Sequence, residues 1–102
     1  MCDENTICVV PVAGVTWTGM NDDVEGLNNA LEEFNAKTGY EIPIHVDAAS
    51  GGFILPFLNP DKKWDFRLKW VLSISTSALK FKVFNFTPLH PANHIVIFYY
   101  NF

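Results

Sequence analysis

The sequence predicts an α/β fold built on a βαβ unit with mostly parallel strands. Three segments predict it: a β-branched apolar run at residues 6–12, an amphipathic helical pattern at residues 21–38, and a second short apolar run at residues 44–49. When a strand, a helix and a strand follow one another closely, the two strands usually lie parallel in one sheet. With 102 residues, 49% of them hydrophobic, the chain is expected to form one soluble globular unit.

The first run, residues 6–12, is apolar and β-branched nearly throughout. Such a composition is typical of a strand covered on both faces of a parallel sheet, so we expect a central strand here. The turn that follows places hydroxyl side chains, among them Thr16, between Gly14 and Gly19.

The helix is expected to begin after Asn21, Asp22 and Asp23, which are all N-cap candidates. Its apolar positions recur at spacings of three, four and three, which places one stripe against a sheet, and they are Val24, Leu27, Leu31 and Phe34. Gly39 is expected to end the helix, because a glycine readily adopts the left-handed conformation found just past a helix end.

The second strand, residues 44–49, runs into Ser50, Gly51 and Gly52. Residues 53–67 are rich in proline and aromatic side chains and are expected to be irregular. A third strand pattern, residues 70–75, comes shortly before Lys80.

The composition changes after Phe81, where aromatic side chains and two prolines crowd a segment without glycine. We therefore expect two parts, residues 1–81 and a divergent aromatic tail, residues 82–102. His90 and His94 lie four positions apart in this tail, but the intervening Pro91 and the lack of acidic neighbours argue against a metal site.

The formal net charge of −4 and the scattered basic residues argue against a nucleic-acid partner. The acidic N-terminus does not resemble a secretory signal, and no run is long enough to cross a membrane, so a cytoplasmic protein is expected. Cys2 and Cys8 are too few for a disulfide framework.

Three polar residues fall at the predicted carboxyl ends of strands, where ligands of open parallel sheets gather: Thr16, Asp47 and Lys80. A buried carboxylate needs a partner, and a protonated ring nitrogen would serve. A lysine whose pKa is lowered can form an imine with an aldehyde.

The block at residues 45–53, His-Val-Asp-Ala-Ala-Ser-Gly-Gly-Phe, is followed by Trp64-Asp65-Phe66-Arg67 and then by Lys80, 33 positions beyond Asp47 (80 − 47). This order resembles the cofactor-binding core of glutamate decarboxylases, which are group II pyridoxal-phosphate-dependent decarboxylases. The resemblance covers roughly residues 5–81, and it implies part of the large domain of the PLP-dependent transferase fold, fold type I.

The resemblance implies a role for five residues. Lys80 matches the lysine that binds pyridoxal 5'-phosphate covalently, and Asp47 matches the carboxylate that pairs with its pyridine nitrogen, which makes these two the expected catalytic pair. Ala49 matches the small residue against the ring, Thr16 a hydroxyl near its substituents or the substrate, and Ser77 a residue near the phosphate. The reaction implied is decarboxylation of L-glutamate to 4-aminobutyrate, in relatives that are homo-oligomeric.

The chain departs from the family beside the lysine, where Ala78 and Leu79 replace the usual Gly-His pair. Leucine offers no donor to a phosphate, so a lower cofactor affinity is expected and the chain alone is expected to be incomplete as a catalyst. Two alternatives remain open. One is a non-catalytic remnant or small interaction module derived from such an enzyme, and the other is an unrelated α/β binder of a small ligand.

Overall fold

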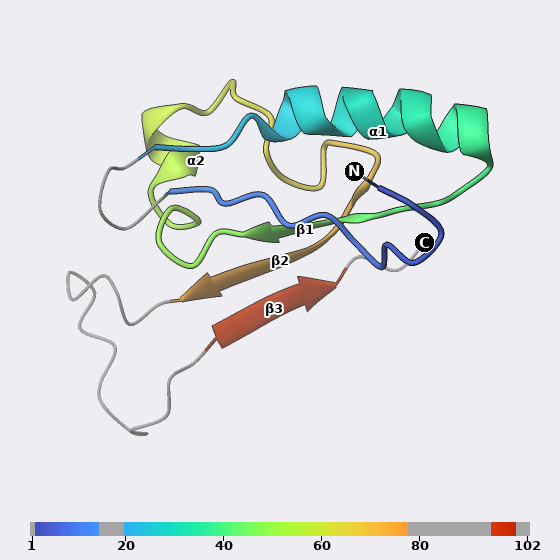
Figure 1. Ribbon diagram of the computed structural model, residues 1–102. Helices are drawn as coiled ribbons and strands as arrows, with labels where there is room; N and C mark the ends of the chain where they lie inside the picture. Colours follow the sequence, from blue (N-terminus) through green and yellow to red (C-terminus); the bar gives the residue numbers. More distant parts are fainter. Residues whose placement is uncertain (1, 15–19, 78–94, 100–102) are drawn as a thin grey trace.

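The computed structural model describes residues 2–14, 20–77 and 95–99 of the chain. In chain order, these contain helix α1 (Val24–Thr38), strand β1 (Ile44–Asp47), the short helix α2 (Leu55–Leu58), strand β2 (Val71–Ser77) and strand β3 (Ile95–Tyr99) (Figure 1).

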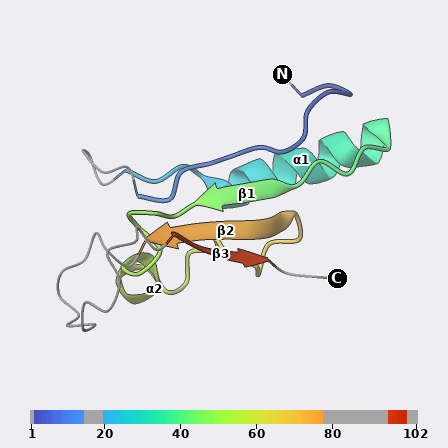
Figure 2. The same cartoon turned by 90° about the horizontal axis from the view of Figure 1, so that it is seen from below.

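The three strands form one sheet in the order β1-β2-β3. Strand β1 runs parallel to β2, as the sequence predicts, and β3 runs antiparallel to β2. Strand β3 is not among the predicted strands, although residues 95–99 combine β-branched and aromatic residues that favour a strand. Helix α1 covers one face of the sheet, and in the part of the chain that is described no helix covers the opposite face (Figure 2).

Residues 9–13 run beside β1 in a parallel direction, which confirms the expected βαβ order. They form only isolated bridges, Val9 with Ile44 and Val12 with Asp47. The prediction of a central strand covered on both faces is wrong for this structure, because Ile7 and Val10 are 87% and 52% exposed. Within the described residues, β1 is the only named strand beside this segment. Its other side is paired only at the end, where Ala13 forms an antiparallel bridge with Asn21, so residues 8–10 form an open edge.

Helix α1 begins and ends where its sequence predicts. The Asp23 carboxylate accepts a hydrogen bond from the Gly26 amide and caps the first turn. Gly39 ends the helix with a φ of 77°, and its amide donates to the Asn35 carbonyl oxygen. Asp23 is therefore the N-cap among the three candidates.

The core lies between α1 and the sheet. Ile44, Val46 and Ala48 are fully buried on the face toward Val24 and Leu31 of the helix. These large apolar side chains lose their contact with water on folding, and this loss is the main favourable contribution to stability.

Two asparagines of α1 are also buried, which the hydrophobic stripe does not predict. The Asn35 side chain accepts a hydrogen bond from the Ile42 amide and donates to the Ile42 carbonyl oxygen. The Asn28 side chain accepts from the Trp70 amide. Both asparagines thus join α1 to the main chain just before a strand, which satisfies their polar groups and fixes the helix on the sheet.

The exposed side of α1 is joined to the start of β2 through Glu32. Its carboxylate accepts hydrogen bonds from the Lys69 ammonium, at 2.9 Å, and from the Trp70 indole. The Lys69 ammonium also lies 5.0 Å from the centre of the Trp70 ring. The hydrogen bond from Lys69, followed by that from Trp70, lowers the pKa of Glu32 below its ordinary value of 4.5.

This lowered pKa predicts a pH dependence of folding stability. A carboxyl whose pKa is lower in the folded state contributes stability above pH 4.5, and this contribution is lost as the pH falls through the folded-state pKa. We expect Glu32→Gln to destabilise the chain more at pH 7 than at pH 3. Urea unfolding at both pH values measures this difference.

Glu33 provides the matched control. Its carboxylate also has a lowered pKa, through Lys37 in the next turn of the same helix, but this pair is exposed and does not reach the sheet. Glu33→Gln should therefore cost less at pH 7 than Glu32→Gln. Equal losses for the two variants would contradict the role assigned to the contact with β2.

Residues 53–67 are mostly irregular, as predicted, apart from the four-residue helix α2. Arg67 fixes the loop before β2: its side chain donates to the Asp65 carboxylate at 2.9 Å and to the carbonyl oxygens of Pro60 and Lys62. The hydrogen bond that Arg67 donates to the Asp65 carboxylate raises the pKa of Arg67. These bonds give the Asp65–Arg67 contact a structural role in the loop.

Candidate active site

Asp47 lies at the carboxyl end of β1, and both its amide and its carbonyl oxygen form hydrogen bonds with the neighbouring segment. Its amide donates to the Pro11 carbonyl oxygen at 3.0 Å, and its own carbonyl oxygen accepts from the Ala13 amide at 2.9 Å. Alternate side chains of β1 are buried and half-buried, with Ile44 and Val46 toward the core. The Asp47 side chain therefore points to the sheet face away from α1.

The Asp47 carboxylate is half-buried, and its Oδ1 atom accepts a hydrogen bond from the Ala49 amide at 3.1 Å. A carboxylate has about four acceptor positions, so one bond from a main-chain amide leaves capacity for a charged donor. Ala49 itself is half-buried and adds only a methyl group beside the carboxylate. The position suits an approaching flat, positively charged donor.

Strand β2 presents serines on the same face. Ser75 is paired with Asp47, and Ser73 is paired with His45. The His45 Nδ1 atom lies 2.6 Å from the Ser73 hydroxyl oxygen, with the donor set by the tautomer of the ring. His45 and Asp47 lie two positions apart on β1 and therefore share a face, and the contact found for His45 is with the neighbouring strand.

Two loops meet at this edge of the sheet. The Gly51 amide donates to the Ala13 carbonyl oxygen at 3.1 Å, which joins the turn after Asp47 to the end of the first segment. A methyl group placed on Gly51 would lie 2.4 Å from that oxygen, and one placed on Gly14 would lie 2.8 Å from Gly51 itself. The approach of these two main-chain segments thus depends on the two glycines.

The structure brings together three of the five predicted site residues. Asp47, Ala49 and Ser77 all lie at or just beyond the carboxyl ends of β1 and β2, which face the same edge of the sheet (Figure 1). Ser77 is the last residue of β2 and is half-buried. Thr16 and Lys80 lie outside the described residues, as do His90 and His94.

Sequence reasoning missed the structural role of Asp22. It appeared there only as an N-cap candidate, whereas its carboxylate accepts a hydrogen bond from the Val12 amide at 2.7 Å. No spacing rule links an aspartate to an amide ten positions earlier, so the sequence carried no signal for this contact.

The described residues contain no group of three histidine, cysteine or acidic side chains that could hold a metal ion. In the same part of the chain, no helix has both the length and the apolar character needed to cross a membrane.

A family model for the pyridoxal-dependent decarboxylase conserved domain matches residues 1–88. The chain therefore belongs to the pyridoxal-dependent decarboxylase family. Its fold is a small α/β piece of fold type I, as the sequence predicts.

Within this family, the relatives are glutamate decarboxylases. The chain is 63% identical over 81 residues to glutamate decarboxylase 5 of Arabidopsis thaliana, a match that covers 79% of this chain and 16% of the relative. It is 60% identical over 79 residues to glutamate decarboxylase beta of Listeria monocytogenes, covering 78% of this chain and 17% of that protein. The chain thus spans about one sixth of the length of these relatives.

A solved structure gives the same result. The glutamate decarboxylase of Lactobacillus brevis superposes with a TM-score of 0.70 at 48% sequence identity, over 74% of this chain and 17% of that one. The predicted resemblance to glutamate decarboxylases is confirmed.

The family implies a pyridoxal cofactor, and the described part of the site fits one. The Asp47 carboxylate is half-buried, has spare acceptor capacity and has only a methyl group beside it at Ala49. These properties match a protonated, planar, aromatic nitrogen base.

Proposed function

We propose that this chain is a cofactor-binding segment of a pyridoxal-phosphate-dependent glutamate decarboxylase. In this proposal, residues 1–81 form the cofactor-binding part and residues 82–102 are a divergent tail. The reaction is α-decarboxylation of L-glutamate to 4-aminobutyrate and carbon dioxide, in the cytoplasm. The observation that carries the proposal is the position of Asp47 at the end of β1, in a chain that is 63% identical over 81 residues to a glutamate decarboxylase.

Each predicted residue has a distinct task. Asp47 holds a proton on the pyridine nitrogen, and Ala49 leaves room for the ring beside that carboxylate. Lys80 is the covalent attachment point, Thr16 binds near the ring substituents or the substrate carboxylate, and Ser77 contributes near the phosphate. The bound cofactor supplies the electron sink that stabilises the charge left when carbon dioxide departs.

The chain alone is expected to be incomplete as a catalyst. Leu79, beside Lys80, has no hydrogen-bond donor for a phosphate, which lowers the affinity for the cofactor. A chain of 102 residues also leaves a large share of its surface in water, and so encloses a cofactor poorly. Binding without turnover is therefore the expected behaviour of the isolated chain.

The second candidate function is a non-catalytic module that binds another protein, such as a full-length decarboxylase subunit. Exposed apolar side chains on α2 favour it, since Phe57 and Leu58 are 84% and 68% exposed. Contiguous apolar patches of this kind are commonly protein contacts.

A spectroscopic titration tests the proposed function. We expect pyridoxal phosphate to produce the absorbance band of a lysine-bound cofactor with the unmodified chain, and we expect Lys80→Ala to abolish this band. Lys82→Ala is the matched control, because it removes a lysine two positions away and should keep the band. Carbon dioxide release from glutamate is then measured on the same samples.

The outcomes separate the two candidate functions. A band that depends on Lys80 supports a cofactor-binding segment, with or without turnover. A band that persists in Lys80→Ala, or no band with the unmodified chain, contradicts the proposal and leaves the non-catalytic module.

A further inference from the structure

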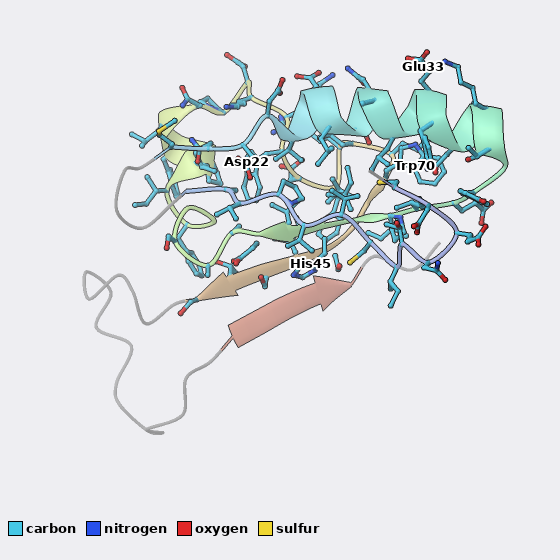
Figure 3. The ribbon with its side chains drawn as sticks, viewed as in Figure 1. Asp22, Glu33, His45 and Trp70 are labelled. Carbon is cyan, nitrogen blue, oxygen red and sulfur yellow. The ribbon has the colours of Figure 1, made fainter. Side chains whose placement is uncertain are left out.

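Asp22 holds the end of the first segment in two places. Its carboxylate Oδ2 atom accepts from the Val12 amide at 2.7 Å, and its own amide donates to the Val12 carbonyl oxygen at 2.9 Å. Figure 3 shows Asp22 on the segment that leads into α1, alongside the segment that carries Val12. Ala13 also forms an isolated antiparallel bridge with Asn21, so the residues just before α1 run beside residues 12 and 13, and the Asp22 carboxylate satisfies the Val12 amide there.

Val12 is adjacent to the residue that contacts the candidate site. The Ala13 amide donates to the Asp47 carbonyl oxygen at 2.9 Å, and the Ala13 carbonyl oxygen accepts from Gly51 at 3.1 Å. The Asp22 carboxylate is therefore linked, through Val12 and Ala13, to the main chain at Asp47 and Gly51, which lie on either side of Ala49. A shift of Val12 would move Ala13 and, with it, the turn that carries the Asp47 carboxylate.

We propose that Asp22 is a positioning residue for the candidate active site, which acts by fixing residues 12 and 13 and through them the turn at residues 47–51. Its effect on the cofactor rests on the function proposed above, whereas its effect on the turn does not. The hydrogen bond to Val12 has an ionised acceptor and is short, which makes it stronger than a bond between neutral groups.

Asp23 provides an internal comparison for this role. It is the next residue, it carries the same charge, and it is exposed like Asp22, but its carboxylate accepts from Gly26 inside α1. Removing Asp23 loosens the start of the helix without touching Val12. Comparing variants of the two aspartates therefore separates a general loss of folding stability from a displacement of residues 12 and 13.

The experiment measures amide hydrogen exchange and cofactor binding in the full chain. We expect Asp22→Ala to accelerate exchange of the Val12, Ala13 and Gly51 amides about tenfold, which is the effect of losing one charged hydrogen bond. The dissociation constant for pyridoxal phosphate should rise by a similar factor. Asp22→Asn should keep both the exchange rates and the dissociation constant close to those of the unmodified chain, because its amide oxygen can still accept a hydrogen bond from the Val12 amide.

Asp23→Ala is expected to accelerate exchange in the first turn of α1 and to leave Gly51 and the cofactor affinity unchanged. The positioning role is overturned if Asp22→Ala leaves Ala13 and Gly51 at their original rates, or if Asp23→Ala affects them equally. If exchange at Gly51 responds to Asp22→Ala but the unmodified chain shows no cofactor band, the positioning role stands and the proposed function fails.

Discussion

Gly51→Ala is expected to cost about 3 kcal/mol of unfolding free energy, which is a large part of the stability of so small a chain. The added methyl group would lie 2.4 Å from the Ala13 carbonyl oxygen and 2.9 Å from the Ala13 carbonyl carbon. Both atoms belong to the main chain, so no side-chain rotation relieves the overlap. The two segments must move apart, which also breaks the hydrogen bond from the Gly51 amide.

Urea unfolding followed by circular dichroism measures this loss. Gly39→Ala is the control, because Gly39 has a φ of 77° but no atom within 4 Å of an added methyl group. That variant should lose only about 1 kcal/mol, from the cost of a left-handed conformation. A loss for Gly51→Ala no larger than that of Gly39→Ala would show that the two segments are not in close contact.

Ile44→Ala is expected to destabilise the chain by about 3 kcal/mol, within the range found for large-to-small changes in protein cores. Ile44 is fully buried at the start of β1, between α1 and the sheet. Truncation of its side chain creates a cavity beneath the helix. The loss of unfolding free energy combines the lost burial of apolar surface with the lost van der Waals contacts around the cavity.

A graded series makes this prediction specific. Ile44→Val should cost about 1 kcal/mol, and Ile7→Ala should change the unfolding free energy by no more than about 0.5 kcal/mol because Ile7 is 87% exposed. Equal losses at positions 7 and 44 would contradict the described core. The midpoint of urea unfolding gives all three values in one experiment.

Local sequence signals were sufficient to predict helix α1 and the parallel direction of the two extended segments on either side of it. The acidic residues before Val24 and the glycine at position 39 supply both helix ends, and each depends on residues within one turn of the helix. The order of strand, helix and strand then leaves little choice of topology, because crossover connections of this kind are almost always right-handed and parallel.

The features that the sequence did not predict depend on distant contacts. Asn28 and Asn35 are polar, so a pattern based on hydrophobicity places them in water, yet each bonds main-chain groups beyond the helix. The exposure of Val10 has a similar cause, since an apolar run indicates burial only when another element covers it. Helix α2 is a single turn with Pro56 near its start, too short for a periodic pattern.

For the candidate site, Asp47 and Ala49 are predicted by a block, residues 45–53, that resembles glutamate decarboxylases. The structure shows which main-chain groups hold this part of the chain. The contacts from Pro11 and Ala13 to this turn involve main-chain atoms, whose partners no residue type reveals. The roles of Thr16, Lys80 and Ser77 remain predictions, and the titration with Lys80→Ala examines that of Lys80.

The open edge at residues 8–10 has a consequence for handling the protein. Exposed main-chain donors and acceptors beside apolar side chains act as a template on which a further extended chain can add, so self-association competes with folding. Ile7 and Val10 leave this template without charged residues that would repel such addition. Refolding yields should consequently fall as the chain is concentrated, and dilute conditions favour the folded monomer.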